Sequence, residues 1–101
     1  MSIKDDFAAS RRTFILRLLV EGNGSANSSV IYRAAMHAGV GCRTRDDITA
    51  DLDHLKRHGC ITDEWLDEAV RIAEITDRGE DAAYGRVEIP GVDQSRWNRR
   101  P

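Results

Sequence analysis

The chain has 101 residues, of which 41% are hydrophobic and 32% charged, which is the composition of one small folded domain and not of a disordered chain. No apolar run approaches the roughly 20 residues of a membrane span, and residues 1–6 are too polar for a signal peptide, so we expect a cytoplasmic protein. The formal net charge of -2 neither indicates nor excludes a nucleic-acid partner.

Two helices are predicted in the first part of the chain. Apolar residues at helical spacing predict a helix over residues 3–20, and the glycines and asparagine of residues 22–24 end it. A second, shorter helix begins at Asn27 or Ser28 and ends at Gly39. Its alanines allow another helix to approach closely, as in a three-helix cluster.

The third predicted helix has the clearest boundaries. Thr44 with Asp47 three residues later approximates a capping box, and Gly59 ends the helix. The apolar spacing predicts a core made by Ile48, Leu52, Leu55 and Ile75. At about 100° per residue, the opposite face of the helix holds Arg43, Asp46, Ala50, Asp53, His54 and Arg57.

The pattern after Gly59 changes from helical to extended. Residues 60–62 and 69–76 are rich in β-branched side chains and predict two strands with a turn at Asp67 and Glu68. Thr76 then caps a short fourth helix that ends near residue 85. The order predicts a mainly α winged helix-turn-helix: a three-helix cluster, a two-stranded β-hairpin wing and a short C-terminal helix over residues 1–85, followed by an extended tail over residues 86–101.

Three stretches resemble known proteins. Residues 52–61, Leu-Asp-His-Leu-Lys-Arg-His-Gly-Cys-Ile, resemble the junction between recognition helix and first wing strand in bacterial regulators of the ArsR and MarR type. Residues 73–79, Ala-Glu-Ile-Thr-Asp-Arg-Gly, resemble their second wing strand. Residues 75–86, with Ile-Pro-Gly-Val at 89–92, resemble a family of small uncharacterised proteins of Mu-like phages and prophages. That resemblance implies a phage or prophage origin and transfers no biochemical role.

The third helix is the candidate nucleic-acid-binding element. Its predicted contacts to phosphates and base edges of double-stranded DNA come from Arg43, Arg45, Thr49, His54 and Arg57. Carboxylates on the same face repel phosphate unless they pair with arginine or accept a hydrogen bond from cytosine. An ordinary surface pair between Asp53 and Arg57 is therefore the alternative to DNA recognition.

The predicted wing favours a protein partner more than DNA. Acidic residues surround its turn, where a phosphate contact would need lysine or arginine. Trp65 and Leu66 are large apolar residues at the same turn, and they either fold back on the core or contact another phage protein. The tail contains Arg96, Trp97, Arg99 and Arg100, which form either a basic DNA-binding arm or a frayed, solubilising end.

Other functions find little support in the sequence. His54, His58 and Cys60 have a spacing that could hold a metal, but two surface histidines are the more ordinary reading, and we expect neither metal nor cofactor. Both cysteines are expected to be reduced. The sequence contains no recognisable set of nucleophile, base and orienting residue, so we expect no enzyme activity. A chain this small gains core by association, which predicts a homodimer through the N-terminal helix or the C-terminal segment.

Overall fold

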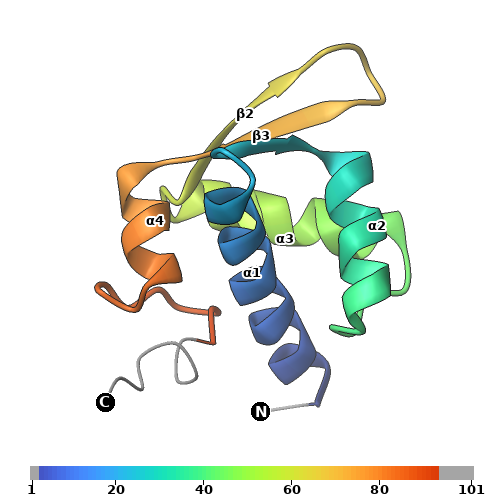
Figure 1. The fold of residues 1–101 in the computed structure, drawn as a ribbon. Helices are drawn as coiled ribbons and strands as arrows, with labels where there is room; N and C mark the ends of the chain where they lie inside the picture. The colour runs from blue at the N-terminus through green and yellow to red at the C-terminus, as the bar shows by residue number, and fades with distance from the viewer. Residues whose placement is uncertain (1–2, 94–101) are drawn as a thin grey trace.

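The computed structural model describes residues 3–93, apart from the side chain of Lys4. Four helices and a small sheet make up the fold, and the sheet lies across one end of the helices (Figure 1). In chain order the elements are α1 (Ile3–Glu21), β1 (Ser25–Asn27), α2 (Ser28–Ala38), α3 (Arg45–Arg57), β2 (Ile61–Trp65), β3 (Arg71–Ile75) and α4 (Asp77–Ala83). The predicted order of helices and hairpin is confirmed, and none of the described helices is long and apolar enough to cross a membrane.

The predicted two-stranded wing is extended by a third strand. The sheet is antiparallel with the order β1-β3-β2, so β3 pairs on both edges. The sequence did not indicate β1, because its Ser-Ala-Asn lacks the β-branched and aromatic residues typical of strands. A turn with Asn23 at φ 70° and Gly24 at φ 93° brings this short segment from α1 onto the free edge of β3.

The predicted helix ends are confirmed by their caps. The side chain of Asn27 accepts a hydrogen bond from the backbone N–H of Val30 at 2.9 Å. Thr44 and Asp47 form the full capping box at the start of α3. Thr76 accepts a hydrogen bond from the backbone N–H of Gly79 at 3.0 Å and so caps α4.

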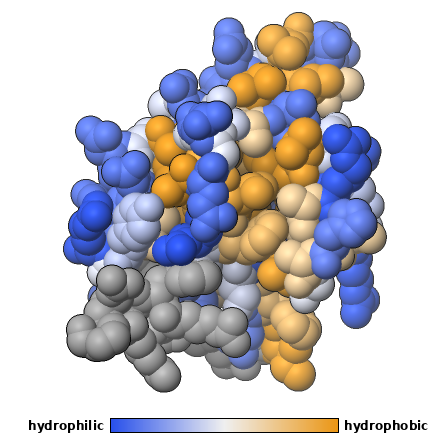
Figure 2. Space-filling view, viewed as in Figure 1, coloured by the Kyte–Doolittle hydropathy of each residue, from blue (hydrophilic) through white to orange (hydrophobic). Residues whose placement is uncertain are grey.

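Helix α1 is apolar on two sides. One side enters the core, and the other carries Ile3 and Phe7, which are both exposed. Figure 2 shows apolar surface on this side of the molecule, in a band that reaches the N-terminal end of α1. A helix that buries only one of two apolar sides leaves a surface suited to a partner.

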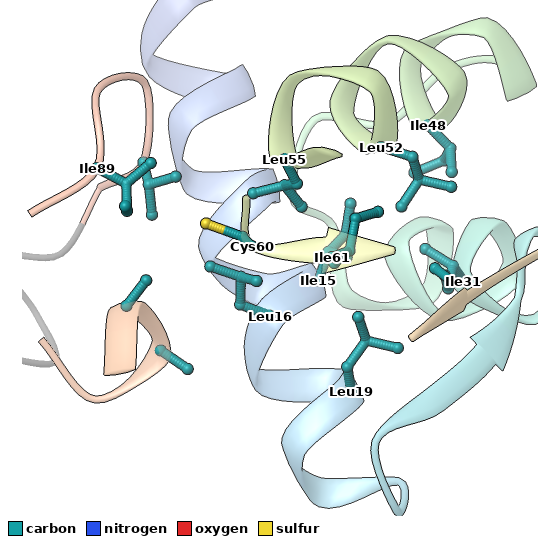
Figure 3. Packing of buried hydrophobic residues seen from close by; sticks show 14 of the residues in the cluster. Ile15, Leu16, Leu19, Ile31, Ile48, Leu52, Leu55, Cys60, Ile61 and Ile89 are labelled. Atoms are coloured by element: carbon teal, nitrogen blue, oxygen red, sulfur yellow. The ribbon is translucent and has the colours of Figure 1, made fainter. Parts of the chain in front are cut away.

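The core lies between α1, α3 and the sheet (Figure 3). The predicted orientation of α3 is confirmed, because Ile48, Leu52 and Leu55 are buried, whereas Ile75 is only partly buried at the edge of the core. Other buried core residues come from α1, α2, α4, the turn before β2, two strands and the segment after α4: Ile15, Leu16, Leu19, Ile31, Ala35, Cys60, Ile61, Ala73, Ala82, Ala83, Ile89 and Val92. Neither cysteine is in a disulfide, as predicted.

Residues 86–93 contain no helix or strand, yet they pack against the domain. Ile89 is buried, and the Arg12 side chain donates a hydrogen bond to the carbonyl oxygen of Gly91 at 2.9 Å. The backbone N–H of Asp93 donates to the carbonyl oxygen of Ala9 at 3.2 Å. The core therefore includes residues beyond 85, the predicted boundary between the domain and the tail. The basic arm predicted from Arg96, Trp97, Arg99 and Arg100 lies outside the described residues.

Candidate nucleic-acid interface

A buried carboxylate fixes the orientation of α3. Asp51 is fully buried and accepts hydrogen bonds from two arginines of α1, from Arg11 Nη2 at 3.2 Å and from Arg12 Nε at 3.1 Å. Burial raises the pKa of the Asp51 carboxyl, and the two guanidinium groups oppose that shift. Because the carboxylate is held at two points by α1, the opposite side of α3 is turned toward solvent.

The exposed side of α3 carries charges of both signs. Asp46, Ala50, Asp53 and Arg57 are exposed along its outer ridge, at the helical spacing expected for one face. Arg43, just before the helix, is exposed as well. A duplex approaching this ridge would therefore meet two carboxylates beside the two arginines.

Arg45 and Thr49 lie on the flank of α3 that faces α2 and the wing. Arg45 Nη1 donates a hydrogen bond to Ser29 Oγ at 3.2 Å, and the guanidinium lies 4.7 Å from the centroid of the Tyr32 ring. Thr49 is exposed and, with Tyr32 and Trp65, lines a cavity of about 200 Å³ between α2, α3 and the wing. Arg45 thus connects the start of α3 to the start of α2.

A network of ion pairs joins α3 to the wing. Arg71 of β3 is buried, and it pairs with Asp53 at 2.9 Å through Nη1 and with Asp63 of β2 at 2.7 Å through Nε. Lys56 of α3 pairs with the same Asp63 at 2.8 Å. The hydrogen bond from Lys56, followed by that from Arg71, lowers the pKa of the Asp63 carboxyl. Two cations and two carboxylates therefore neutralise each other at the base of the wing.

The structure separates His54 from the other predicted contacts. His54 lies on the opposite flank of α3, where its Nε2 is 2.7 Å from the carbonyl oxygen of Pro90 and its ring packs on that of His58. Burial lowers the pKa of His54. A side chain engaged with the C-terminal segment is poorly placed to reach a base edge beside Thr49.

The tip of the wing is acidic and apolar together. Trp65 is 52% exposed and Leu66 66% exposed, although the Arg71 guanidinium lies 5.5 Å from the centroid of the Trp65 ring. Asp67 has a structural role, because its carboxylate accepts hydrogen bonds from the backbone N–H groups of Ala69 and Val70 in the turn. Contact of Trp65 and Leu66 with a protein partner stays a prediction, and both side chains are accessible for such a contact.

Sequence reasoning missed the ion pairs of Lys56 and Arg71, because their partners lie on different elements. The alternation of side chains along β2 did indicate that Asp63 faces inward. Residues 61 and 63 share one face of β2, so Asp63 follows the buried Ile61 inward and does not join the exposed acidic residues around it. A carboxylate on an inner face requires a cation, and Arg71 stands on the inner face of β3.

The succession of α1, β1, α2, α3 and the β2–β3 hairpin defines a winged-helix protein. A chain of the complex structure of hsRosR-S1 has the same fold, with a TM-score of 0.63 at 21% identity. The likeness covers 74% of the present chain and 65%, just under two thirds, of that chain.

The sequence also has a phage relative. No protein-family model matches it. The chain is 32% identical over 94 residues to the uncharacterised protein gp26 of Escherichia phage Mu, a match that covers 93% of this chain and 96% of gp26. It therefore belongs to the family of gp26, in agreement with the predicted resemblance to proteins of Mu-like phages. The likeness to ArsR-type and MarR-type regulators stays a prediction.

Proposed function

We propose that this protein is a regulatory DNA-binding protein of a phage or prophage, which binds double-stranded DNA with α3 in the major groove. The observation that carries the proposal is the exposure of the outer side of α3 from Asp46 to Arg57, together with Arg43 just before the helix, within a winged-helix fold. Both arginines are exposed and able to contact phosphate or base edges. Binding of this kind requires no catalytic group, in keeping with the expectation that the protein is not an enzyme.

The charges of this surface suggest where phosphate contacts form. Arg43 lies just before α3 and Arg57 is its last residue, while Arg45 lies on the flank of the helix beside Ser29. Lys56 and Arg71 are neutralised by carboxylates at the base of the wing, so they add little to the attraction for DNA. We therefore propose that α3 supplies most phosphate contacts and that the wing supplies few.

Fluorescence anisotropy with labelled duplexes tests the proposal. Duplexes enriched by selection from a random pool would be titrated with the protein, with Arg43→Ala and with Arg57→Ala. Each substitution removes a cation from the proposed surface, so we expect binding to weaken several-fold. Arg86→Ala is the matched control, because Arg86 is exposed near α4 and pairs with Asp81 at 3.0 Å. The control should bind like the parent.

Two results would contradict the proposal. One is that no duplex is enriched and no binding is detected at low salt, where electrostatic attraction is strongest. The other is that Arg43→Ala and Arg57→Ala bind as tightly as Arg86→Ala. The second result would mean that any affinity for DNA resides elsewhere on the protein.

A protein partner at the wing is the second candidate function. The observation that favours it is the exposure of Trp65 and Leu66 beside Glu64 and Glu68, which together offer an apolar anchor with a negative rim. Such a tip would dock on a basic and apolar surface of another phage protein. Replacement of Leu66 with Glu should abolish that contact without affecting DNA binding by α3, so the same variant separates the two functions.

A further inference from the structure

An unfilled apolar surface lies along α1. A groove of about 620 Å³ runs along α1, with one edge formed by residues 38–40 and the other touched by Asp93. Its apolar lining comes chiefly from Phe7, Phe14 and Leu18. In the view of Figure 1, α3 passes behind α1, and the described residues that line the groove include none from α3.

The apolar side chains of the groove have a helical spacing of their own. Phe7, Phe14 and Leu18 follow one another at steps of seven and four, and with Ile3, four residues before Phe7, they lie on one face of α1. That face is distinct from the one that buries Ile15, Leu16 and Leu19. The surface is therefore a second apolar face of α1 that is only partly covered, since Phe7 is exposed and Phe14 and Leu18 are partly buried against the core.

Phe7 is held in place on this face. Its side chain is 50% exposed. A Cβ atom at Gly41 would lie only 2.9 Å from the Cβ of Phe7, so the absence of a side chain at Gly41 lets Phe7 pack closely against the loop after α2. A half-exposed ring fixed on one side presents a rigid apolar contact with small entropy loss on binding.

We propose that a second copy of this chain fills the groove, with the two α1 helices antiparallel. One register pairs all the large apolar residues of the face at once. When Phe7 lies level with Phe14 of the second copy, Ile3 lies level with Leu18 of that copy, because both pairs are symmetric about the point between residues 10 and 11. The two-fold axis repeats each pair, so four apolar contacts form along helices about 28 Å long.

The charges of α1 fit the antiparallel arrangement and oppose the parallel one. Asp6 is in the first turn and Arg17 is near the end, and both flank the apolar face on the same side at helical spacing. In the antiparallel register, Arg17 lies within about 3 Å of axial height of the second copy's Asp6. A parallel pair would set Asp6 level with Asp6 and Arg17 level with Arg17, which is repulsive.

Sedimentation velocity over the micromolar range tests whether the dimer exists. The full chain should sediment as a concentration-dependent dimer, and Phe7→Glu should raise its dissociation constant at least about tenfold by placing a charge in the apolar contact. Leu66→Glu is the matched control, because Leu66 is also exposed and apolar but lies on the wing. A parent chain that stays monomeric, or a dimer lost equally in both variants, would overturn the proposal.

Charge exchange tests the register. Asp6→Arg alone sets two cations against each other and should weaken the dimer, and so should Arg17→Asp, which also faces Glu21 at 3.7 Å within its own helix. The double variant restores opposite charges across the interface and should recover the dimer. Failure of the double variant to recover, while circular dichroism shows it folded, would overturn the antiparallel register.

Disulfide trapping tests direction independently. In a Cys42→Ser background, Ser10→Cys lies next to the symmetry point and should form a disulfide with its counterpart under mild oxidation. Ile3→Cys should not, because the two copies of residue 3 stand about 22 Å apart along antiparallel helices. Efficient cross-linking through residue 3 would show parallel helices and refute the proposal. Trp97→Ala should dimerise like the parent, and a stronger dimer in that variant would indicate that the chain's own tail competes for the groove.

Discussion

Replacement of Asp63 with alanine tests the connection between α3 and the wing. The side chain of Asp63 is only 6% exposed and pairs with both Lys56 and Arg71. Removing one partner of a buried ion pair costs about 3–5 kcal/mol, because the remaining charge is left without compensation. Arg71 keeps its pair with Asp53 in the variant, so we expect the smaller loss of about 2–3 kcal/mol in the free energy of unfolding.

Urea unfolding monitored by circular dichroism at pH 7 measures this loss. Glu64→Ala is the control, since Glu64 neighbours Asp63 on β2 but is exposed, and its loss should stay within about 0.5 kcal/mol. A loss for Asp63→Ala no greater than that of the control would refute the assignment of Asp63 as the centre of the network.

The pH dependence of the same variant provides a second test. Lys56 and Arg71 lower the pKa of Asp63 in the folded protein, so its contribution is fully present above the unfolded value of about 3.9. The contribution is lost as the pH falls through the lower folded pKa. The difference in stability between the parent and Asp63→Ala should therefore shrink below about pH 4. A difference that is the same at pH 7 and in acid would contradict an ionised Asp63.

Three further predictions concern the core, the C-terminal segment and DNA. Leu52→Ala should lower the free energy of unfolding by about 2–5 kcal/mol in a denaturant melt, because Leu52 is fully buried, and a much smaller loss would contradict the packing of α3. Burial lowers the pKa of His54, so its NMR titration should have a midpoint below about 6.5, and protein stability should fall as the pH decreases through that region. The salt dependence of DNA binding should have a slope of magnitude about 3–5 per protomer, and Glu64→Gln with Glu68→Gln should bind as well as the parent or better. A steeper slope, or weaker binding by that double variant, would place phosphate contacts on the wing.

Local chemistry made much of the fold predictable from the sequence. Helix α3 could be located without knowledge of the rest of the chain, because the signals at its two ends are local. The capping box of Thr44 and Asp47 involves only neighbouring residues, and so does the turn at Gly59. Strand β1 could not, because its three residues are extended only by virtue of the free edge of β3. Pairing between distant segments overrides weak local propensity.

The candidate site was harder to predict than the fold. Helical spacing correctly placed Asp46, Ala50, Asp53 and Arg57 on the exposed side of α3. It gave no sign that His54, assigned to the same face, lies against Pro90, since residues 86–93 have no periodicity of their own. Asp51 was equally hidden. Asp51 lies next to the apolar stripe of α3, but an aspartate there is expected to be buried only when its cationic partners are known, and these come from α1.

The neutral network at the base of the wing has a consequence for affinity. A protomer whose Lys56 and Arg71 are occupied by carboxylates has few cations left for phosphate, so one α3 alone would bind DNA weakly at physiological salt. If two protomers associate through α1, binding of the second α3 to DNA becomes an intramolecular step once the first is bound. The affinity of the dimer for DNA then rises without any additional cation on either protomer. Phe7→Glu should therefore weaken DNA binding although Phe7 is on α1 and not on α3, and the loss should diminish as the protein concentration rises. If Phe7→Glu produced monomers that bind DNA as tightly as the parent, affinity would come from a single α3, and the proposed link between association and recognition would be wrong.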